Sequence, residues 1–263
     1  MKAVNAGLVL VIVGIVVGVL WFGLGRRSEE EVERLVVVVP HHGIKKDLRM
    51  DFWREECEKY DCGAVETVVL LSPNHFDINQ ERVVYSEVEW TVSDGILENY
   101  NGGYEGELLV EYEVDEAKVR EDHGIVSLVG EVREFFPGAK LAPFLIGNRI
   151  EFAELGELNK YIEQICERSC AVVGSVDFSH NVKEGLAREQ DERTVRLLGQ
   201  GDLRDGELWV SEERAEVDSP QVLYLLQHFG NVLGREFGLW RRTSSNEMDM
   251  DAVVTSHVLG YWE

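Results

Sequence analysis

The stretch LVVVVPHHG (35–43) decides the fold of this chain and indicates where its site lies. Its first five residues are one Leu and four Val, a composition typical of a strand that is buried on both faces of a sheet. Pro40 ends this run with a residue that cannot donate a backbone hydrogen bond. His41 and His42 come next, so we expect two imidazoles at the carboxyl end of a buried strand.

Two other stretches repeat this pattern of an apolar strand followed by a histidine. VETVVLLSPNHF (65–76) places His75 after such a run, and AVVGSVDFSH (171–180) places His180 after another. In open α/β sheets, ligands bind in the crevice at the carboxyl ends of the strands. A single histidine after a strand is more often structural, but three in the same context favour one shared, metal-capable site.

The remaining periodicity predicts an α/β fold: a mixed, mostly parallel central sheet with helices on both faces. A fourth buried strand is expected at 140–146. Between the strands lie amphipathic stretches that we predict to be helices, at 48–59, 124–136, 152–168, 184–198 and 219–229. Ser219 and Pro220 suit the N-cap and first turn of the last one. Residues 81–114 alternate apolar and polar residues, which indicates a hairpin or an antiparallel edge.

The amino-terminal segment predicts a membrane anchor. The run from Ala6 to Gly25 carries no charged residue, and a membrane-spanning helix needs about 20 such residues. A cleaved signal peptide is the rival, but its apolar core is usually shorter, about 7–15 residues. We therefore expect an anchor at 1–27, a linker at 28–34 and one domain at 35–263, with the membrane as a partner and a single-pass membrane location. Charges and cysteines leave the side of the membrane undecided.

The net charge and the cysteines limit the possible functions further. The formal net charge is −23, which repels nucleic acid, so we expect no nucleic-acid partner. The four cysteines form two local pairs, Cys57 with Cys62 and Cys166 with Cys170. They suit two small disulfides or, alternatively, four free and buried thiols. Hydrolase motifs such as G-x-S-x-G or HExxH are absent from the sequence.

Two residues near the three histidines suggest proton chemistry. Asp177 lies three positions before His180 and could accept a hydrogen bond from an imidazole N–H. His123 stands at the start of an expected helix, where it is either a general acid or base or a surface residue at the helix end. We therefore take His180, His123 and Asp177 as candidate catalytic residues. His228 and His257 are interpreted as structural.

The order of the histidine motifs resembles the Memo family, also called AmmeMemoRadiSam system protein B. The family pattern runs PHAG, GPSHH or GPNHH, EHSIE, SSDFSHY and CGxxPI. This chain has, in the same order, PHHG (40–43), LLSPNHF (70–76), EDHGI (121–125), GSVDFSHN (174–181) and EVDSPQV (216–222). The resemblance covers nearly all of residues 35–263.

The resemblance implies a fold similar to the catalytic subunit of class III extradiol dioxygenases, with a metal pocket. The family ligands correspond to His41, His75 and His180, together with a Cys that falls on Glu216 when the motifs are matched through Pro220. We therefore expect a divalent metal held by His41, His75 and Glu216, with iron or copper favoured and zinc possible, because two histidines and a carboxylate suit non-haem iron. Asp218 is the competing carboxylate.

Departures from the family pattern leave two functions open. The Glu of EHSIE is Val126, and the second His of GPNHH is Phe76. The first hypothesis is a metal-dependent redox or dioxygenase-like enzyme. The alternative is a non-catalytic module that binds a peptide or small ligand in the same pocket. The sequence leaves the substrate, the metal and the oligomeric state open.

Overall fold

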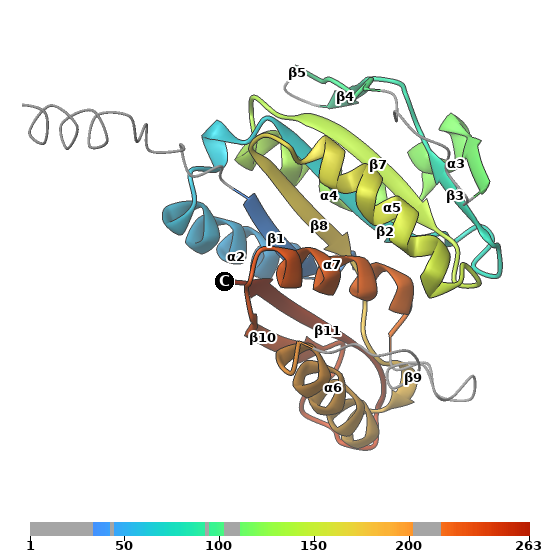
Figure 1. Cartoon of the computed structure of the whole chain (residues 1–263). Helices are drawn as coiled ribbons and strands as arrows, with labels where there is room; N and C mark the ends of the chain where they lie inside the picture. Colours follow the sequence, from blue (N-terminus) through green and yellow to red (C-terminus); the bar gives the residue numbers. More distant parts are fainter. Residues whose placement is uncertain (1–33, 43–44, 93–94, 103–110, 202–216) are drawn as a thin grey trace, which may run out of the picture. The chain divides into compact units, whose positions relative to one another are not determined.

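Four parallel strands form the middle of the main sheet (Figure 1). The computed structural model describes residues 34–42, 45–92, 95–102, 111–201 and 217–263. Within them the four strands lie side by side in the order β1 (Arg34–Val39), β8 (Cys170–Ser175), β2 (Thr67–Pro73) and β7 (Lys140–Ile146). Their carboxyl ends therefore lie along one edge of the sheet, as the sequence predicted.

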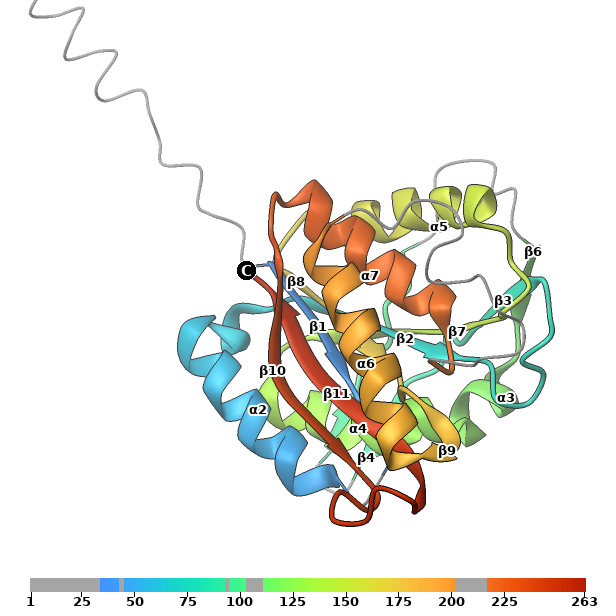
Figure 2. The same ribbon diagram turned by 90° about the horizontal axis from the view of Figure 1, so that it is seen from below.

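Helices cover both faces of this sheet (Figure 2). In β1, Val36 and Val38 pack on one face, while Leu35, Val37 and Val39 pack on the other, and all five are buried. Residues of α5 (Phe152–Ile165) and α7 (Pro220–Val232) pack against the first set; residues of α2 (Lys46–Lys59) and α4 (His123–Phe135) pack against the second. This arrangement confirms the predicted α/β fold with helices on both faces.

Antiparallel pairs occur toward both rims of the sheet. β11 (Val253–Trp262) pairs with β1, with β10 (Phe237–Ser244) and with β9 (His180–Lys183). At the other rim β3 (Arg82–Tyr85) is antiparallel to β7 and parallel to β6 (Glu111–Val114), which confirms the predicted antiparallel edge. The remaining elements are the hairpin of β4 (Trp90–Val92) and β5 (Gly95–Leu97), the helices α3 (Glu116–Glu121) and α6 (Glu184–Gly199), and a 3₁₀ turn at Cys62–Ala64.

Two disulfides lie at the amino-terminal edge of the sheet. Cys57–Cys62 links the last turns of α2 to the 3₁₀ turn before β2. Cys166–Cys170 links the end of α5 to the first residue of β8. Of the two alternatives that the sequence left open, the structure therefore has the two local disulfides.

The predicted membrane anchor is corrected. The segment 1–27 and most of the linker 28–34 lie outside the described residues, and Arg34 already belongs to β1. The longest described α-helix is α6, with 16 residues, and no described helix is long and apolar enough to cross a membrane, which takes about 20 residues. The predictions of a transmembrane helix, of the membrane as a partner and of a membrane location are therefore withdrawn.

Candidate metal centre

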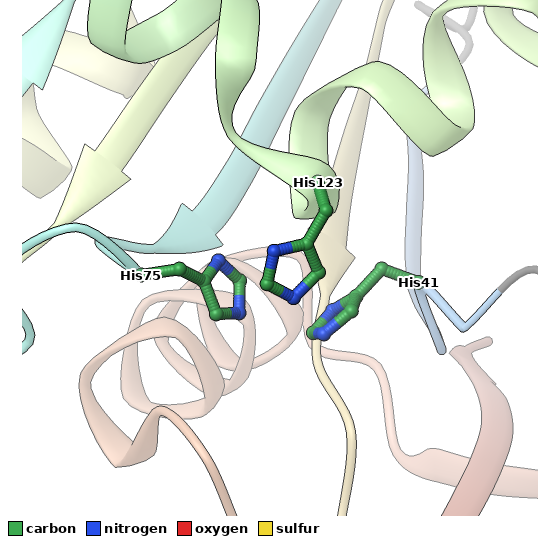
Figure 3. A group of neighbouring side chains, drawn as sticks. All are labelled: His41, His75 and His123. Atoms are coloured by element: carbon green, nitrogen blue, oxygen red, sulfur yellow. The ribbon is translucent and has the colours of Figure 1, made fainter.

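Three imidazoles meet at the carboxyl edge of the sheet (Figure 3). His41 follows β1, His75 follows β2 and His123 is the first residue of α4. The His41 ring lies 4.8 Å from the rings of both His75 and His123, measured between centroids, and the His75 and His123 rings are 3.7 Å apart. Side chains from three separate elements thus share one small volume.

Asp218 adds a carboxylate to this volume and brings His180 with it. The Oδ2 atom of Asp218 lies 3.6 Å from Nε2 of His41 and 4.0 Å from Nε2 of both His75 and His180. Asp218 stands just before Ser219, the N-cap of α7, whose side chain accepts a hydrogen bond from the amide of Val222. The expected cap therefore fixes the chain where the Asp218 side chain enters the site.

A second carboxylate, Asp177, is surrounded by three histidines. Its Oδ2 atom is 3.2 Å from Nε2 of His41 and is hydrogen-bonded to Nδ1 of His42. Its Oδ1 atom is 3.2 Å from Nδ1 of His257 on β11. The Asp177 amide also donates to Oδ2 of Asp218 over 3.2 Å, so the two carboxylates are held in adjoining positions.

A third carboxylate, Asp122, orients His75. Asp122 is the N-cap of α4 and accepts from the amide of Gly124, as an N-cap aspartate does. Its Oδ2 atom is 2.9 Å from Nδ1 of His75. If Nδ1 carries the proton, the lone pair of Nε2 is directed into the cluster. At Gly124 an added Cβ would lie 2.0 Å from Oγ of Ser72, so only glycine allows α4 to approach β2 this closely.

Buried polar contacts also hold the loop after β1. Arg49 of α2 is 1% exposed and donates to the backbone carbonyls of Pro40 and His42. Glu131 of α4 accepts from the same guanidinium over 2.7 Å. These hydrogen bonds fix the Arg49 side chain in one conformation. Arg49 therefore connects the backbone at Pro40 and His42 to α2 and α4, which cover the same face of the sheet.

Burial keeps most of these imidazoles neutral. Desolvation, together with the neighbouring histidines, lowers the pKa of His41 to about 3. Burial likewise lowers the pKa values of His123 and His180. His42 differs: its hydrogen bond to Asp177 raises its pKa. Neutral imidazoles have free lone pairs, which is the form that binds metals.

The pKa values of the two adjoining carboxylates, Asp177 and Asp218, are shifted in opposite directions. Burial alone would raise the pKa of Asp177, but hydrogen bonds from His257 and His42 hold it well below its ordinary value. Burial and the nearby charge of Asp177 raise the pKa of Asp218 well above its ordinary value. A cation beside Asp218 would favour the ionised form of its carboxyl.

The donor set fits a divalent metal ion. Nε2 of His75, Nε2 of His180 and Oδ1 of Asp218 are buried and have no hydrogen-bond partner among the described residues. Ligand atoms that share one metal at about 2.1 Å stand about 3–4 Å apart, which matches the separations around Asp218. Three overlapping groups could hold an ion: His41, His75 and His123; His41, His42 and Asp177; and Asp177, His180 and Asp218.

The structure brings together most of the residues expected from the sequence. His41, His75, His180, His123 and Asp177 are all in this cluster. Glu216 lies outside the described residues, so its role as a ligand stays a prediction.

Two contacts were missed by sequence reasoning. Asp122 was not singled out, although an acidic residue before an expected helix start is an N-cap signal. His257 was interpreted as structural, yet it contacts Asp177 across 80 sequence positions, and nothing local in the sequence signals this.

Comparison with known proteins gives relatives of one family. No family model matches the chain. A MEMO1 family protein of Nitrosopumilus maritimus is 23% identical over 205 residues, which cover 74% of this chain and 72% of the relative. A MEMO1 family protein of Aquifex aeolicus is 27% identical over 183 residues, which cover 66% of this chain and 64% of the relative.

The fold also has a counterpart among solved structures. The crystal structure of an uncharacterised protein from Escherichia coli K12 matches with a TM-score of 0.55 and 15% identity, over 87% of this chain and 99% of that one. This likeness concerns the fold alone. Both sequence relatives are MEMO1 family proteins, which confirms the resemblance to the Memo family that the order of the motifs predicted.

Proposed function

We propose that this Memo-family chain is a metal-dependent enzyme whose histidine cluster carries redox or dioxygenase-like chemistry. The observation that carries the proposal is the position of Asp218, whose Oδ2 atom lies within 4.0 Å of Nε2 of His41, His75 and His180. Three imidazoles and one carboxylate would hold an iron or copper ion, with zinc as the alternative. Such an ion would supply Lewis acidity and, if it is iron or copper, electron transfer.

Asp218 is our preferred carboxylate ligand, ahead of Glu216. Its Oδ1 atom is buried without a partner among the described residues, and burial together with the nearby charge of Asp177 raises the pKa of its carboxyl. Its backbone is fixed as well, because Asn148 donates to its carbonyl over 2.7 Å. Glu216 remains the alternative carboxylate ligand, because matching the family motifs through Pro220 puts the family Cys at this position.

Two exposed imidazoles are suited to move protons at the mouth of the site. The pKa of His42 is raised by its bond to Asp177, so His42 favours its protonated form and can donate. The pKa of His123 is lowered by burial and by the nearby His75, so its neutral ring can accept. Two groups whose pKa values are pushed apart suit general acid and general base roles. We assign the remaining candidates to positioning: Asp177 orients three rings, and His180 completes the pocket.

Metal analysis of the purified full chain tests this proposal. We expect about one iron, copper or zinc per chain after reconstitution, and at least a tenfold loss of metal affinity in His75→Ala. His228→Ala is the matched control, because His228 pairs with Glu163 outside the cluster. If no metal binds to the wild-type chain, or if His75→Ala retains it in full, the proposal fails.

The same measurement separates the two carboxylates. We expect Asp218→Asn to lose metal and Glu216→Gln to retain it. The opposite result would assign the ligand to Glu216 and leave Asp218 as a buried neighbour. Oxygen consumption with catechols, measured on the loaded wild-type chain, then tests the dioxygenase-like reaction itself.

A second candidate function is ligand binding without turnover. Phe76 and Val126 replace polar family residues, and both are large exposed hydrophobic side chains, 50% and 48% exposed. They stand one and three positions after His75 and His123 in the sequence. A chain that binds metal and a peptide or small molecule but consumes no oxygen with any catechol would favour this candidate.

A further inference from the structure

A cavity of about 250 Å³ lies on the face of the sheet that α5 covers. None of its lining residues belongs to the histidine cluster. Its walls come from β3, β6, β7, α5 and the segments that follow β3 and β5. Five of the described lining residues are aromatic: Tyr85, Tyr100, Tyr112, Phe144 and Tyr161.

Two pairs of rings in this cavity meet at steep angles, whereas Tyr85 and Phe144 meet at 34°. Tyr85 and Tyr112 are 6.2 Å apart between centroids with planes at 76°, and Phe144 and Tyr161 are 6.0 Å apart with planes at 83°. The Tyr161 hydroxyl donates to the Gly102 carbonyl over 3.0 Å, which fixes that ring. The aromatic rings that line this cavity are thus held in several orientations.

The charge around the cavity is negative. Glu87 lines it, and no Lys or Arg is among the described residues that do so. Burial raises the pKa of Tyr161 to about 12, and the nearby Tyr100, Tyr85 and Glu87 add to this shift. The whole chain carries a formal charge of −23. An organic cation would therefore meet a favourable field, whereas an anion would be repelled.

We propose that this aromatic cavity binds a small organic cation of the quaternary ammonium class. Such a cation is attracted to the π faces of aromatic rings, and several rings around one cation form the usual cage for it. It has no N–H group that needs a hydrogen-bond acceptor, so ring contacts and charge alone can recognise it. The Glu87 carboxylate would balance its charge at the rim.

A matched pair of ligands tests the proposal on the wild-type full chain. Choline and its neutral isostere 3,3-dimethylbutan-1-ol have the same shape and differ in charge. By titration calorimetry we expect choline to bind with a dissociation constant at least about tenfold lower than the isostere's, a ratio that two ring contacts can supply. Equal binding of the two would show a merely apolar cavity and overturn the proposal, as would an absence of choline binding at millimolar concentrations.

Variants locate the binding to this cavity. We expect Tyr85→Leu, which removes a π face, to weaken choline binding about tenfold, and Tyr85→Phe, which keeps the face, to change it less than about threefold. Glu87→Gln should weaken binding about threefold, and Glu89→Gln, an exposed control outside the lining, should leave it unchanged. Choline binding that is unchanged in a folded Tyr85→Leu protein, as judged by thermal melting, would overturn the proposal.

Discussion

At their amino-terminal ends, the parallel strands lie beside two disulfides, whereas at their carboxyl ends they lead into a cluster of histidines and aspartates. The first edge is held by Cys57–Cys62 and Cys166–Cys170 and carries no candidate metal group among the described residues. The second edge buries several polar atoms that have no partner among the described residues, including Nε2 of His75 and Oδ1 of Asp218.

This difference indicates how stability and function are divided in the fold. Each buried polar atom without a partner costs about 1–3 kcal/mol. Several such atoms gather around the candidate metal centre at the carboxyl edge, whereas two covalent links stabilise the amino-terminal edge. Functional sites commonly show this conflict between local stability and chemistry.

The largest expected effect on stability comes from binding a metal ion at the carboxyl edge of the sheet. A metal at about 1,000 times its dissociation constant adds about 4 kcal/mol to the free energy of unfolding. For a domain of this size that raises the melting temperature by about 8–16 °C, measurable by calorimetry. Asp218→Asn should lose this increase. A metal-induced shift that survives in Asp218→Asn would remove Asp218 from the ligand set.

Removing the disulfides should weaken the other edge alone. Each closes a short loop, with sequence separations of 5 and 4, and such a link contributes about 2 kcal/mol. We expect Cys57→Ser/Cys62→Ser and Cys166→Ser/Cys170→Ser each to lower the denaturant midpoint while leaving metal affinity unchanged. A large loss of metal affinity in either variant would show that the two edges are coupled.

Lowering the pH should reduce the free energy of unfolding of the metal-free protein through His41 at the carboxyl edge. Burial holds the pKa of His41 at about 3, below about 6.5 in the unfolded chain, so the unfolded state binds more protons between these values. The free energy of unfolding therefore falls as pH is lowered through this window, by about 1–2 kcal/mol from pH 7 to pH 5.

The comparison of wild type with His41→Gln isolates this contribution. His42 acts in the opposite sense, because its raised pKa gives stability that is lost as pH rises. Both proteins keep His42, so its contribution cancels. Denaturant unfolding at the two pH values should show a smaller pH dependence in His41→Gln, and an equal dependence would contradict the burial argument.

The smallest expected effect concerns the cap that positions Asp218. Ser219→Ala removes the hydrogen bond to the amide of Val222 and should cost about 1 kcal/mol of stability. It should also lower metal affinity, since Asp218 is the preceding residue. Asp115→Ala, which removes the N-cap of α3, should cost similar stability without changing metal affinity. Equal metal affinity in both variants would show that the cap is purely structural.

Much of the sheet and half of the site could be predicted from the sequence. The predicted strand at 140–146 matches β7, and the run at 35–39 differs from β1 by one residue, because buried parallel strands have a local signature of continuous apolar residues. His41, His75 and His180 were identified for the same reason, since each follows such a run. The apolar segment before residue 28 was less reliable as evidence, and the membrane anchor drawn from it is withdrawn.

The sequence by itself determined which residues stand at the carboxyl edge of the sheet, because strand periodicity and the proline or polar residue after each strand are local properties. Only the tertiary structure decided which of them meet. Asp122 reaches His75 across 47 positions, and Asp177 reaches His257 across 80. Such contacts depend on how helices and rim strands pack around the sheet. The same packing sets the burial that keeps His41 neutral and the contacts that shift the pKa values of Asp177 and Asp218 in opposite directions.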